Sequence, residues 1–468
     1  MAQRVERNFG FKFEMFPNPE QEKELYKWLW VGKNFWNMIL EQQNSLSGPY
    51  RSLVDIYHEW VEDSKAGRKR NHRKNEYDAK GKLIIHPSWV GKLDKSNKYL
   101  STSFQSSEIK LLRDAYPELE AVPFDIPNRE LRHMEQALKR YSSGVSGWPT
   151  HKKFGKSVTI RKGYGANGSR CKASSEKFVG PDYHALIGFG GCVGNVPFAE
   201  SREIKGSWGD VTISKRADER WYFSVPTDHV KDKVSHAKKG AKYGVDVGWT
   251  NYRNGGDVNL LVFSDNRMFP PPYTGTKTIE DIRKNIKKIR EIDIRISREQ
   301  QSLSRKVPGS NQYKEQKKKI AKLYGKKADL ANNYIWQTTA LLVYTSEWGA
   351  ETIFMENLIG MLKKEKGKAL NNTFSSLAIA RLLQTIEREF ERVGGTCIRV
   401  NPAYTSRTCS RCGHEEKANR NGKEFECKAC GFKANADHNA AMMVKKRGEE
   451  ELKQITEKEL GYQVRDSV

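Results

Sequence analysis

The sequence has no long hydrophobic run, since no stretch approaches the roughly 18 consecutive apolar residues that a membrane-spanning helix needs. Its first residues, MAQRVERNFGFKFEMF, contain no apolar core of a secretory signal peptide. No internal repeat is evident either. These absences predict an intracellular protein, located in the cytoplasm and without a membrane partner.

Cysteine is also scarce, with 7 residues in a chain of 468. Four of them form two C-x-x-C pairs, which in a reducing compartment indicate metal ligands rather than disulfides. These pairs are Cys409 with Cys412 and Cys427 with Cys430. We expect Cys171, Cys192 and Cys397 to be ordinary buried or half-buried thiols.

Negative charge is outnumbered, because 57 Asp and Glu stand against 82 Lys and Arg, a formal net charge of +25. Such an excess indicates a polyanionic partner, since each phosphate that the protein neutralises releases condensed counterions. The 11 Trp and 19 Tyr are available to stack on bases. The composition favours a nucleic-acid-binding protein, with a merely soluble basic surface as the alternative.

The length predicts about three domains of roughly 150 residues, and a hydrophobic content of 37% allows folded cores. Residues 9–15 alternate apolar and polar side chains, which predicts a strand. Asn18, Pro19 and Gln21 follow with the capping box and first-turn proline of a helix. Its expected core stripe is Leu25, Trp28, Leu29, Phe35, Trp36 and Ile39. The cluster Trp28, Trp30, Phe35 and Trp36 could stack on bases, but at helical spacing we expect it in the core.

Residues 50–150 have a helical tendency interrupted by the basic stretch 65–75, which we expect to be a solvated or phosphate-facing loop. Strand patterns follow at 211–214 and 221–225, with a turn at 217–220. The strand at 9–15 can join this sheet, which would make the helical region an insertion within a β domain.

After a lysine-rich linker at 229–242, strand patterns alternate with helical ones, which indicates an α/β sheet covered by helices. The strand patterns are YGVDVG, 260–263, 351–357 and 396–400. Six isoleucines at spacings of three and four, from Ile279 to Ile296, predict a helix, which VPGS at 307–310 connects to a second helix ending near Trp348. A further helix is expected from Thr373 to Val393, ended by Gly394 and Gly395. The basic helices at 283–305 and 314–327 could line a nucleic-acid channel or be solvated faces.

The two C-x-x-C pairs can close a tetrahedral four-thiolate zinc site, which has no open position and is therefore structural. The alternative is a redox-active or lapsed pair of knuckles. Three acids, Asp246, Glu356 and Asp437, lie at the ends or starts of elements in the α/β half. Each alone could be a strand-end or helix-cap carboxylate. Together they have the chemistry that two-metal phosphodiester hydrolysis requires.

Six stretches in this order resemble TnpB-type transposon-encoded RNA-guided nucleases and the related compact type V CRISPR effector nucleases. They are FEMFPNPEQEKEL, RWYFSVPT, GVDVG, FMENL, NPAYTSRTCSRCGH and ADHNAAMMV, and they span residues 13 to 444. GVDVG, FMENL and ADHNAAMMV are similar to the three RuvC motifs of these proteins. NPAYTSRTCSRCGH is similar to the segment that enters their zinc ribbon.

The resemblance implies an α/β multidomain protein: an RNase H-like RuvC nuclease domain with an inserted zinc ribbon, and an N-terminal β-barrel-like wedge domain interrupted by a helical recognition domain. The implied ranges are 1–16 and 152–235 (wedge), 17–151 (recognition), 236–400 (nuclease), 401–434 (zinc ribbon) and 435–468 (third nuclease motif and C-terminal tail). It makes Asp246, Glu356 and Asp437 the catalytic acids that hold two Mg²⁺ ions. The four paired cysteines would hold one structural Zn²⁺. Residues 40–150 and the tail from 448 match no motif.

The function that this resemblance implies is RNA-guided DNA cleavage. The partners would be a guide RNA and target double-stranded DNA beside a short flanking motif, bound by a monomer or homodimer at the prokaryotic nucleoid. Tyr404 and Arg407 are plausible contacts to the nucleic acid. A DNA strand transferase and a non-cutting RNA-guided regulator are the alternatives. The intact acid triad argues against the regulator, and the absence of a recognisable end-binding helix-turn-helix argues against the transferase.

Overall fold

The computed structural model describes residues 9–44, 51–67, 102–120, 122–160, 172–174, 185–189, 193–201, 204, 209–227, 240–248, 259–271, 276–345, 350–358 and 377–465. The chain divides into two compact units, Met1–Val230 and Lys231–Val468. Within the described ranges, no helix is both long and apolar enough to cross a membrane. Most of the predicted basic loop and of the predicted linker, together with Cys171 and Cys192, lies outside these ranges.

The first unit contains a seven-stranded sheet in the order β2-β6-β7-β1-β5-β4-β3. Its strands are β1 (Phe9–Met15), β2 (Ser157–Ile160), β3 (Lys172–Ser174), β4 (Ala185–Gly188), β5 (Asn195–Phe198), β6 (Val211–Lys215) and β7 (Trp221–Thr227). The N-terminal strand β1 pairs antiparallel with β7 along its whole length, from Phe9 opposite Thr227 to Met15 opposite Trp221. The prediction that the first strand joins the later sheet is therefore confirmed, and the intervening helices are an insertion in the chain.

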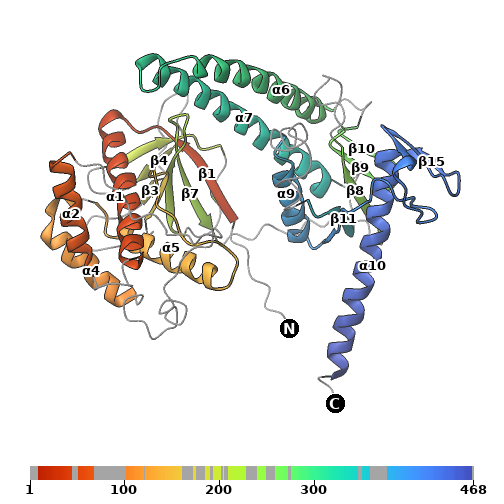
Figure 1. Cartoon of the computed structure of the whole chain (residues 1–468), viewed down its shortest axis with the longest axis horizontal. Helices are drawn as coiled ribbons and strands as arrows, with labels where there is room; N and C mark the ends of the chain where they lie inside the picture. Colours follow the sequence, from red (N-terminus) through yellow and green to blue (C-terminus); the bar gives the residue numbers. More distant parts are fainter. Residues whose placement is uncertain are drawn as a thin grey trace, which may run out of the picture. The chain divides into compact units, whose positions relative to one another are not determined.

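The inserted helices include α1 (Pro19–Asn44), α2 (Leu53–Lys65), α4 (Thr102–Ala115) and α5 (Asp125–Ser142), and Figure 1 shows α1 between the sheet and α2. The predicted capping box is present, because the Gln21 backbone N–H donates to Asn18 Oδ1 at 2.8 Å and the Asn18 N–H donates to Gln21 Oε1 at 3.0 Å. All six residues of the predicted core stripe are buried. The prediction for Trp30 was wrong, because its side chain lies on the opposite face of α1 and is 48% exposed.

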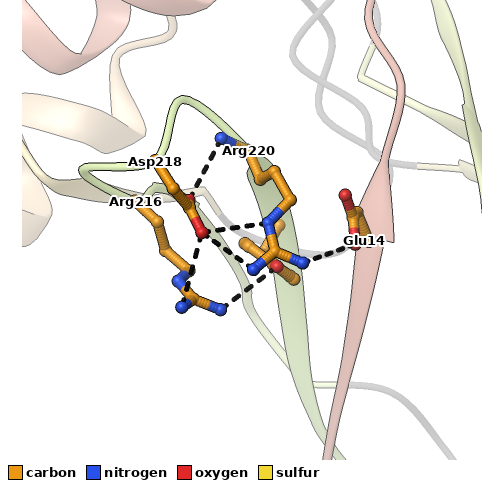
Figure 2. Close-up of polar contacts among 5 residues, drawn as sticks. Glu14, Arg216, Asp218 and Arg220 are labelled. Atoms are coloured by element: carbon orange, nitrogen blue, oxygen red, sulfur yellow. Dashed lines mark hydrogen bonds and ion pairs between the residues drawn. The ribbon is translucent and has the colours of Figure 1, made fainter. Parts of the chain in front are cut away.

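An ionic network stabilises the β6–β7 hairpin turn, which lies where the sequence predicted it. Asp218 is nearly buried and accepts hydrogen bonds from Arg220 Nε at 3.0 Å and Nη2 at 2.8 Å. Arg216 approaches the same carboxylate at 3.5 Å, and Arg220 Nη1 reaches Glu14 of β1 (Figure 2). The network therefore ties the hairpin to the neighbouring central strand.

The second unit contains a five-stranded sheet in the order β10-β9-β8-β11-β12. Its strands are β8 (Lys242–Val247), β9 (Leu261–Phe263), β10 (Met268–Phe269), β11 (Thr352–Glu356) and β12 (Thr396–Val400). Strands β8, β11 and β12 are parallel, whereas β9 is antiparallel to both of its neighbours. The predicted α/β class is therefore correct for this unit.

Helices cover both faces of this sheet, because alternate strand residues point to opposite sides. One core contains Val245, Ile353 and Met355 together with residues of α6 (Lys277–Ser304), α7 (Asn311–Tyr344) and α9 (Ile379–Arg392). On the other face, Phe354 packs in a cluster with Val444 of α10 (Ala436–Arg465). Figure 1 shows α10 running across the sheet and continuing beyond it towards the C-terminus.

The helices of the second unit follow their sequence patterns with two differences at the ends. The six predicted isoleucines of α6 are all buried, and α6 and α7 form the predicted hairpin. Helix α7 ends at Tyr344, earlier than predicted. Helix α9 begins at Ile379, because Ala378 has a left-handed backbone with φ of 48°, so residues 377 and 378 lie outside the helix, contrary to the prediction. The predicted start near Thr373 lies outside the described residues. Gly394, with φ of 91°, lies just after its end, as predicted.

Candidate functional site

Two of the three predicted acids lie side by side at the carboxyl ends of adjacent parallel strands. The β8–β11 pairing places Val245 opposite Met355, so the next residues, Asp246 and Glu356, are neighbours. Val245 and Met355 face the α7–α9 core, so both acids point to the face that α10 covers. Asp246 is 7% and Glu356 is 6% exposed.

The third acid, Asp437, is supplied by the first turn of α10. The Asn435 side chain caps this helix, since its Oδ1 accepts hydrogen bonds from the N–H groups of Asp437 at 2.9 Å and His438 at 3.3 Å. Gly244 allows the helix to lie directly against β8, because a Cβ at this position would be only 2.1 Å from the Ala441 carbonyl oxygen. This close packing brings the start of α10 to the strand ends.

The three carboxylates are close enough to influence one another electrostatically. Burial raises the pKa of Asp246 well above its ordinary value, and the charges of Glu356 and Asp437 raise it further. The positive charge of Arg420 opposes this shift, as does the Val247 backbone N–H. A buried group of like charges is stabilised by a cation, so the electrostatics fit a metal-binding carboxylate cluster.

Three further residues hold the acids in place, and the sequence pattern assigned none of them a role. The Thr405 hydroxyl donates to Glu356 Oε1 at 2.5 Å, and Arg399 Nη1 donates to the Glu356 backbone oxygen at 3.1 Å. Arg420 Nη2 donates to Asp437 Oδ1 at 3.0 Å. Thr405 lies within the recognised NPAYTSRTC stretch, which was an available signal, whereas no spacing in the sequence indicates Arg420.

The four paired cysteines converge as predicted, with all four sulfur atoms within 4.8 Å of one another. Cys409 Sγ lies 3.7 Å from Cys430 Sγ, and Cys412 Sγ lies 3.6 Å from Cys427 Sγ. Tetrahedral Zn²⁺ with Zn–S bonds of ~2.3 Å requires sulfur atoms about 3.8 Å apart, so the cluster fits a single zinc ion. The segment also contains a three-stranded sheet of β13 (Arg420–Asn421), β14 (Glu424–Glu426) and β15 (Lys433–Asn435), and Cys427 and Cys430 lie in the connection from β14 to β15.

The cysteine cluster is linked to the acid cluster by two buried asparagines. Asn419 donates to the Arg407 carbonyl at 3.0 Å and accepts from the Lys428 N–H at 2.9 Å, which connects the two knuckles. The next residue is Arg420, which contacts Asp437. Asn439 of α10 donates to the Thr408 carbonyl at 2.8 Å and accepts from the Ser410 N–H at 3.0 Å. The position of Asp437 therefore depends on the folded cysteine segment from both sides.

The carboxylates are less tightly grouped than the thiolates. Among the described residues, the four cysteines form the only group of three or more metal-ligand side chains whose donor atoms all lie within 4.8 Å of one another. The three acids therefore lie further apart than this limit. Two ions about 3.5–4 Å apart need oxygen ligands spread over a larger volume than one zinc ion does. The oxygen donor set of the three acids therefore fits a pair of Mg²⁺ ions chemically.

Tyr404 and Arg407, the predicted nucleic-acid contacts, lie beside this site. Tyr404 is 54% exposed and has a left-handed backbone with φ of 65°, and the next residue is Thr405, which binds Glu356. The Arg407 guanidinium lies 3.9 Å from the centre of the Tyr404 ring and donates to Glu415 at 2.6 and 3.0 Å. The strained backbone keeps an aromatic ring in solvent next to the acids.

Residues 380–444 match the family model "Cas12f1-like, TNB domain". The chain is 24% identical over 449 residues to InsQ of Escherichia coli (strain K12), named by inference as an RNA-guided DNA endonuclease, covering 93% of this chain and 91% of InsQ. It is 39% identical over 94 residues to the CRISPR-associated endodeoxyribonuclease Cas12f1 of Sulfoacidibacillus thermotolerans, covering 20% of this chain and 21% of Cas12f1. A solved structure titled "Structure of the mini-RNA-guided endonuclease CRISPR-Cas_phi3" aligns with a TM-score of 0.39 at 12% identity, covering 95% of this chain and 93% of that one. The chain is therefore similar to TnpB-type nucleases and to compact type V CRISPR effectors, with InsQ matching most of its length and the Cas12f1-like family model matching residues 380–444.

Proposed function

We propose that this protein is an RNA-guided DNA endonuclease that hydrolyses target DNA at the cluster of Asp246, Glu356 and Asp437. The observation that carries the proposal is the convergence of these acids on one site. The charges of Glu356 and Asp437 are close enough to raise the pKa of the buried Asp246. InsQ, named as an RNA-guided DNA endonuclease, supports the substrate and the guide, and Cas12f1, named as a CRISPR-associated endodeoxyribonuclease, supports the DNA substrate.

The sheet of the second unit supports an RNase H-like RuvC domain. In such a domain an antiparallel hairpin edge is followed by parallel strands whose carboxyl ends carry the acids. The order β10-β9-β8-β11-β12, with β9 antiparallel, has this arrangement. The cysteine segment is then the zinc ribbon inserted before the third motif, and the seven-stranded sheet of the first unit is the wedge domain with its inserted recognition helices.

The donor sets suggest two metals. Asp246, Glu356 and Asp437 would hold two Mg²⁺ ions, and the four cysteines one structural Zn²⁺. When bound, magnesium would supply activation of a water molecule and stabilisation of the leaving oxygen.

The protein's own residues position and screen this site. The Thr405 hydroxyl orients the Glu356 carboxylate, and the capped start of α10 orients Asp437 and favours its negative charge. Arg420 donates a hydrogen bond to the Asp437 carboxylate, and its positive charge can also attract the DNA phosphate. Burial of Asp246 and Glu356 excludes bulk water, which strengthens these interactions.

A bound RNA would select the target by base pairing, while the protein contacts mainly phosphates and shape. Tyr404 and Arg407 beside the acids are proposed contacts to the DNA strand. The lysine-rich faces of α6 and α7 are proposed to line the path of the RNA–DNA duplex. The net charge of +25 is consistent with this extensive phosphate contact.

The test compares Asp246→Ala, Glu356→Ala and Asp437→Ala with wild type, each purified with its guide RNA. We expect no magnesium-dependent cutting of a matched duplex and retained RNA-directed binding. Asp265→Ala, an acid in the β9–β10 turn that pairs with Arg267, is the matched control and should cut normally. Cutting by Asp246→Ala at the wild-type rate would refute the site.

The same assay separates the alternatives. A regulator would bind the target and leave it intact in the wild-type protein. A strand transferase would join supplied pre-cut ends to the target, a product that gel analysis distinguishes from a simple break.

A further inference from the structure

The first unit contains an open groove of about 820 Å³ along the outer side of α1, distant in sequence from the proposed nuclease residues. Three aromatic side chains line it and are largely in solvent: Tyr26 is 47%, Trp30 48% and Phe154 74% exposed. Its volume lies within the range of roughly 300–1,000 Å³ that is typical of ligand sites. Scattered exposed apolar residues are common on proteins, but three aromatics in one hollow indicate a binding surface.

The segment that carries Phe154 is held firmly against α1. The Asn37 side chain donates to the Lys152 carbonyl at 3.0 Å and accepts from the Lys152 N–H at 2.8 Å. Trp36 Nε1 donates to the Thr150 carbonyl at 3.0 Å. Gly155 lies so close to α1 that a Cβ would be 2.1 Å from the Leu29 carbonyl oxygen. The exposed Phe154 ring is therefore presented by a fixed segment rather than by a loose loop.

Tyr26, a second aromatic residue of the groove, is also held in place by its neighbours. The Tyr26 ring packs edge-on against Trp221 of β7, with ring centres 5.3 Å apart. Lys215 donates to the Tyr26 hydroxyl and pairs with Glu22 at 3.2 Å. Because the ionic network in Figure 2 ties the β6–β7 hairpin to β1, the support of Tyr26 is anchored in the sheet. Preorganised aromatic rings lose little conformational entropy when a ligand stacks on them.

The charge of the groove is strongly positive. Its lining includes four lysines, namely Lys23, Lys27, Lys33 and Lys153, and one acid, Glu24. Glu24 lies 3.9 Å from Lys27, which leaves three lysine charges in excess. Partial burial lowers the pKa of Lys33, so a phosphate near its ammonium group would be favourable. Lysines beside stacking aromatics are the combination that binds single-stranded nucleic acid.

We propose that this groove binds unpaired nucleotides of an RNA, with bases stacked on Trp30 and Phe154 and phosphates beside the lysines. The inference deepens the proposed function, which requires a bound RNA, and assigns a place on the protein to a single-stranded part of it. RNA is the favoured occupant because sequence-level RNA recognition targets unpaired nucleotides on aromatic side chains. A double helix is a poorer occupant, since only its terminal base pairs have a free face for the rings.

The test uses the full-length protein freed of RNA in high salt and a fluorescein-labelled, unstructured RNA of about eight nucleotides, within the usual range of site sizes. The variant Trp30→Ala with Phe154→Ala removes both stacking rings. At roughly 1–3 kcal/mol per stacked base, we expect its Kd to rise about 5- to 150-fold for each ring that carries a base. Phe124→Ala, an exposed aromatic of the same unit outside the groove, is the matched control and should bind normally.

A direct location comes from ultraviolet cross-linking of the same RNA, followed by mass spectrometry. We expect cross-linked nucleotides on the peptides that contain Trp30 and Phe154, and loss of these adducts in the double variant. An unchanged Kd together with adducts only elsewhere overturns the groove assignment. A loss of affinity for the equivalent DNA oligonucleotide but not for RNA overturns the choice of RNA.

These outcomes are separable from failure of the proposed function. If wild-type protein retains a guide RNA and cuts matched DNA while the groove variants bind RNA normally, the groove inference alone is wrong. If the wild type neither retains RNA nor cuts, the proposed function fails, and RNA binding in the groove is still judged by the cross-links.

Discussion

The substitution Gly244→Ala tests whether direct packing of α10 on β8 brings the three acids together. The new Cβ would be 2.1 Å from the Ala441 carbonyl oxygen and 2.5 Å from the Lys445 backbone nitrogen. Both are backbone atoms of α10, so no side-chain rotation relieves the clash. Ordinary contact begins near 3.4 Å, so the helix has to move away by about 1.3 Å (3.4 minus 2.1).

Two magnitudes follow from this displacement. Forcing an additional methyl group into a packed contact costs about 1–3 kcal/mol, which corresponds to a Tm about 2–12 °C lower for a unit of this size. Asp437 lies one helical turn before Ala441 and would move with the helix. Because a misplacement of about 1 Å costs on the order of 100-fold in rate, we expect cutting to fall by about that factor.

The assay combines thermal unfolding with single-turnover cleavage of a matched duplex at saturating protein. Gly10→Ala is the control, because it is also a strand glycine and its added Cβ meets no atom within 4 Å. It should leave both quantities unchanged. A Gly244→Ala protein with the Tm and cleavage rate of wild type would show that the close approach of α10 does not set the acid geometry.

Three further predictions concern neighbouring groups. Arg420→Gln should slow cutting by roughly 10- to 150-fold, which corresponds to the free energy of a hydrogen bond between charged groups. Its zinc content should be unchanged. An unaltered cutting rate contradicts a role of Arg420 at Asp437. Cys409→Ser should lower bound zinc from about one ion per chain to near zero in elemental analysis. It should also slow cutting, because the folded cysteine segment holds Arg420 and Asn439 in place. Retention of zinc refutes the ligand set. Burial raises the pKa of Cys397 to about 12, so at pH 8.5 the folded protein should have roughly a thousandfold less thiolate there than an ordinary thiol has. Alkylation at Cys397 should therefore be slow until unfolding, and rapid labelling of the native protein would contradict this burial.

Local patterns in the sequence predicted several elements of this protein correctly, although not α10, which carries Asp437. The alternation at 9–15, the capping box of Asn18 and Gln21 and the isoleucine stripe of α6 each correspond to an observed element, because period and capping act over a few residues. Two details of the predicted helices were wrong. Trp30 is two residues after Trp28, about 200° further around the helix, so it lies on the opposite face of α1 from the core stripe. The left-handed Ala378 sets the start of α9 at Ile379.

The candidate site divides in the same way. Sequence alone determined which residues have metal-binding chemistry, because paired cysteines at short spacing and acids next to apolar strands can be recognised locally. Only the tertiary structure decided that Asp246 and Glu356, 110 positions apart (356 minus 246), are neighbours in parallel strands, and that Thr405 and Arg420 support the acids. Parallel strand pairing and helix packing bring together segments that are far apart in the sequence, and no local pattern specifies such contacts. These contacts form only when the sheet is assembled and α10 packs across it.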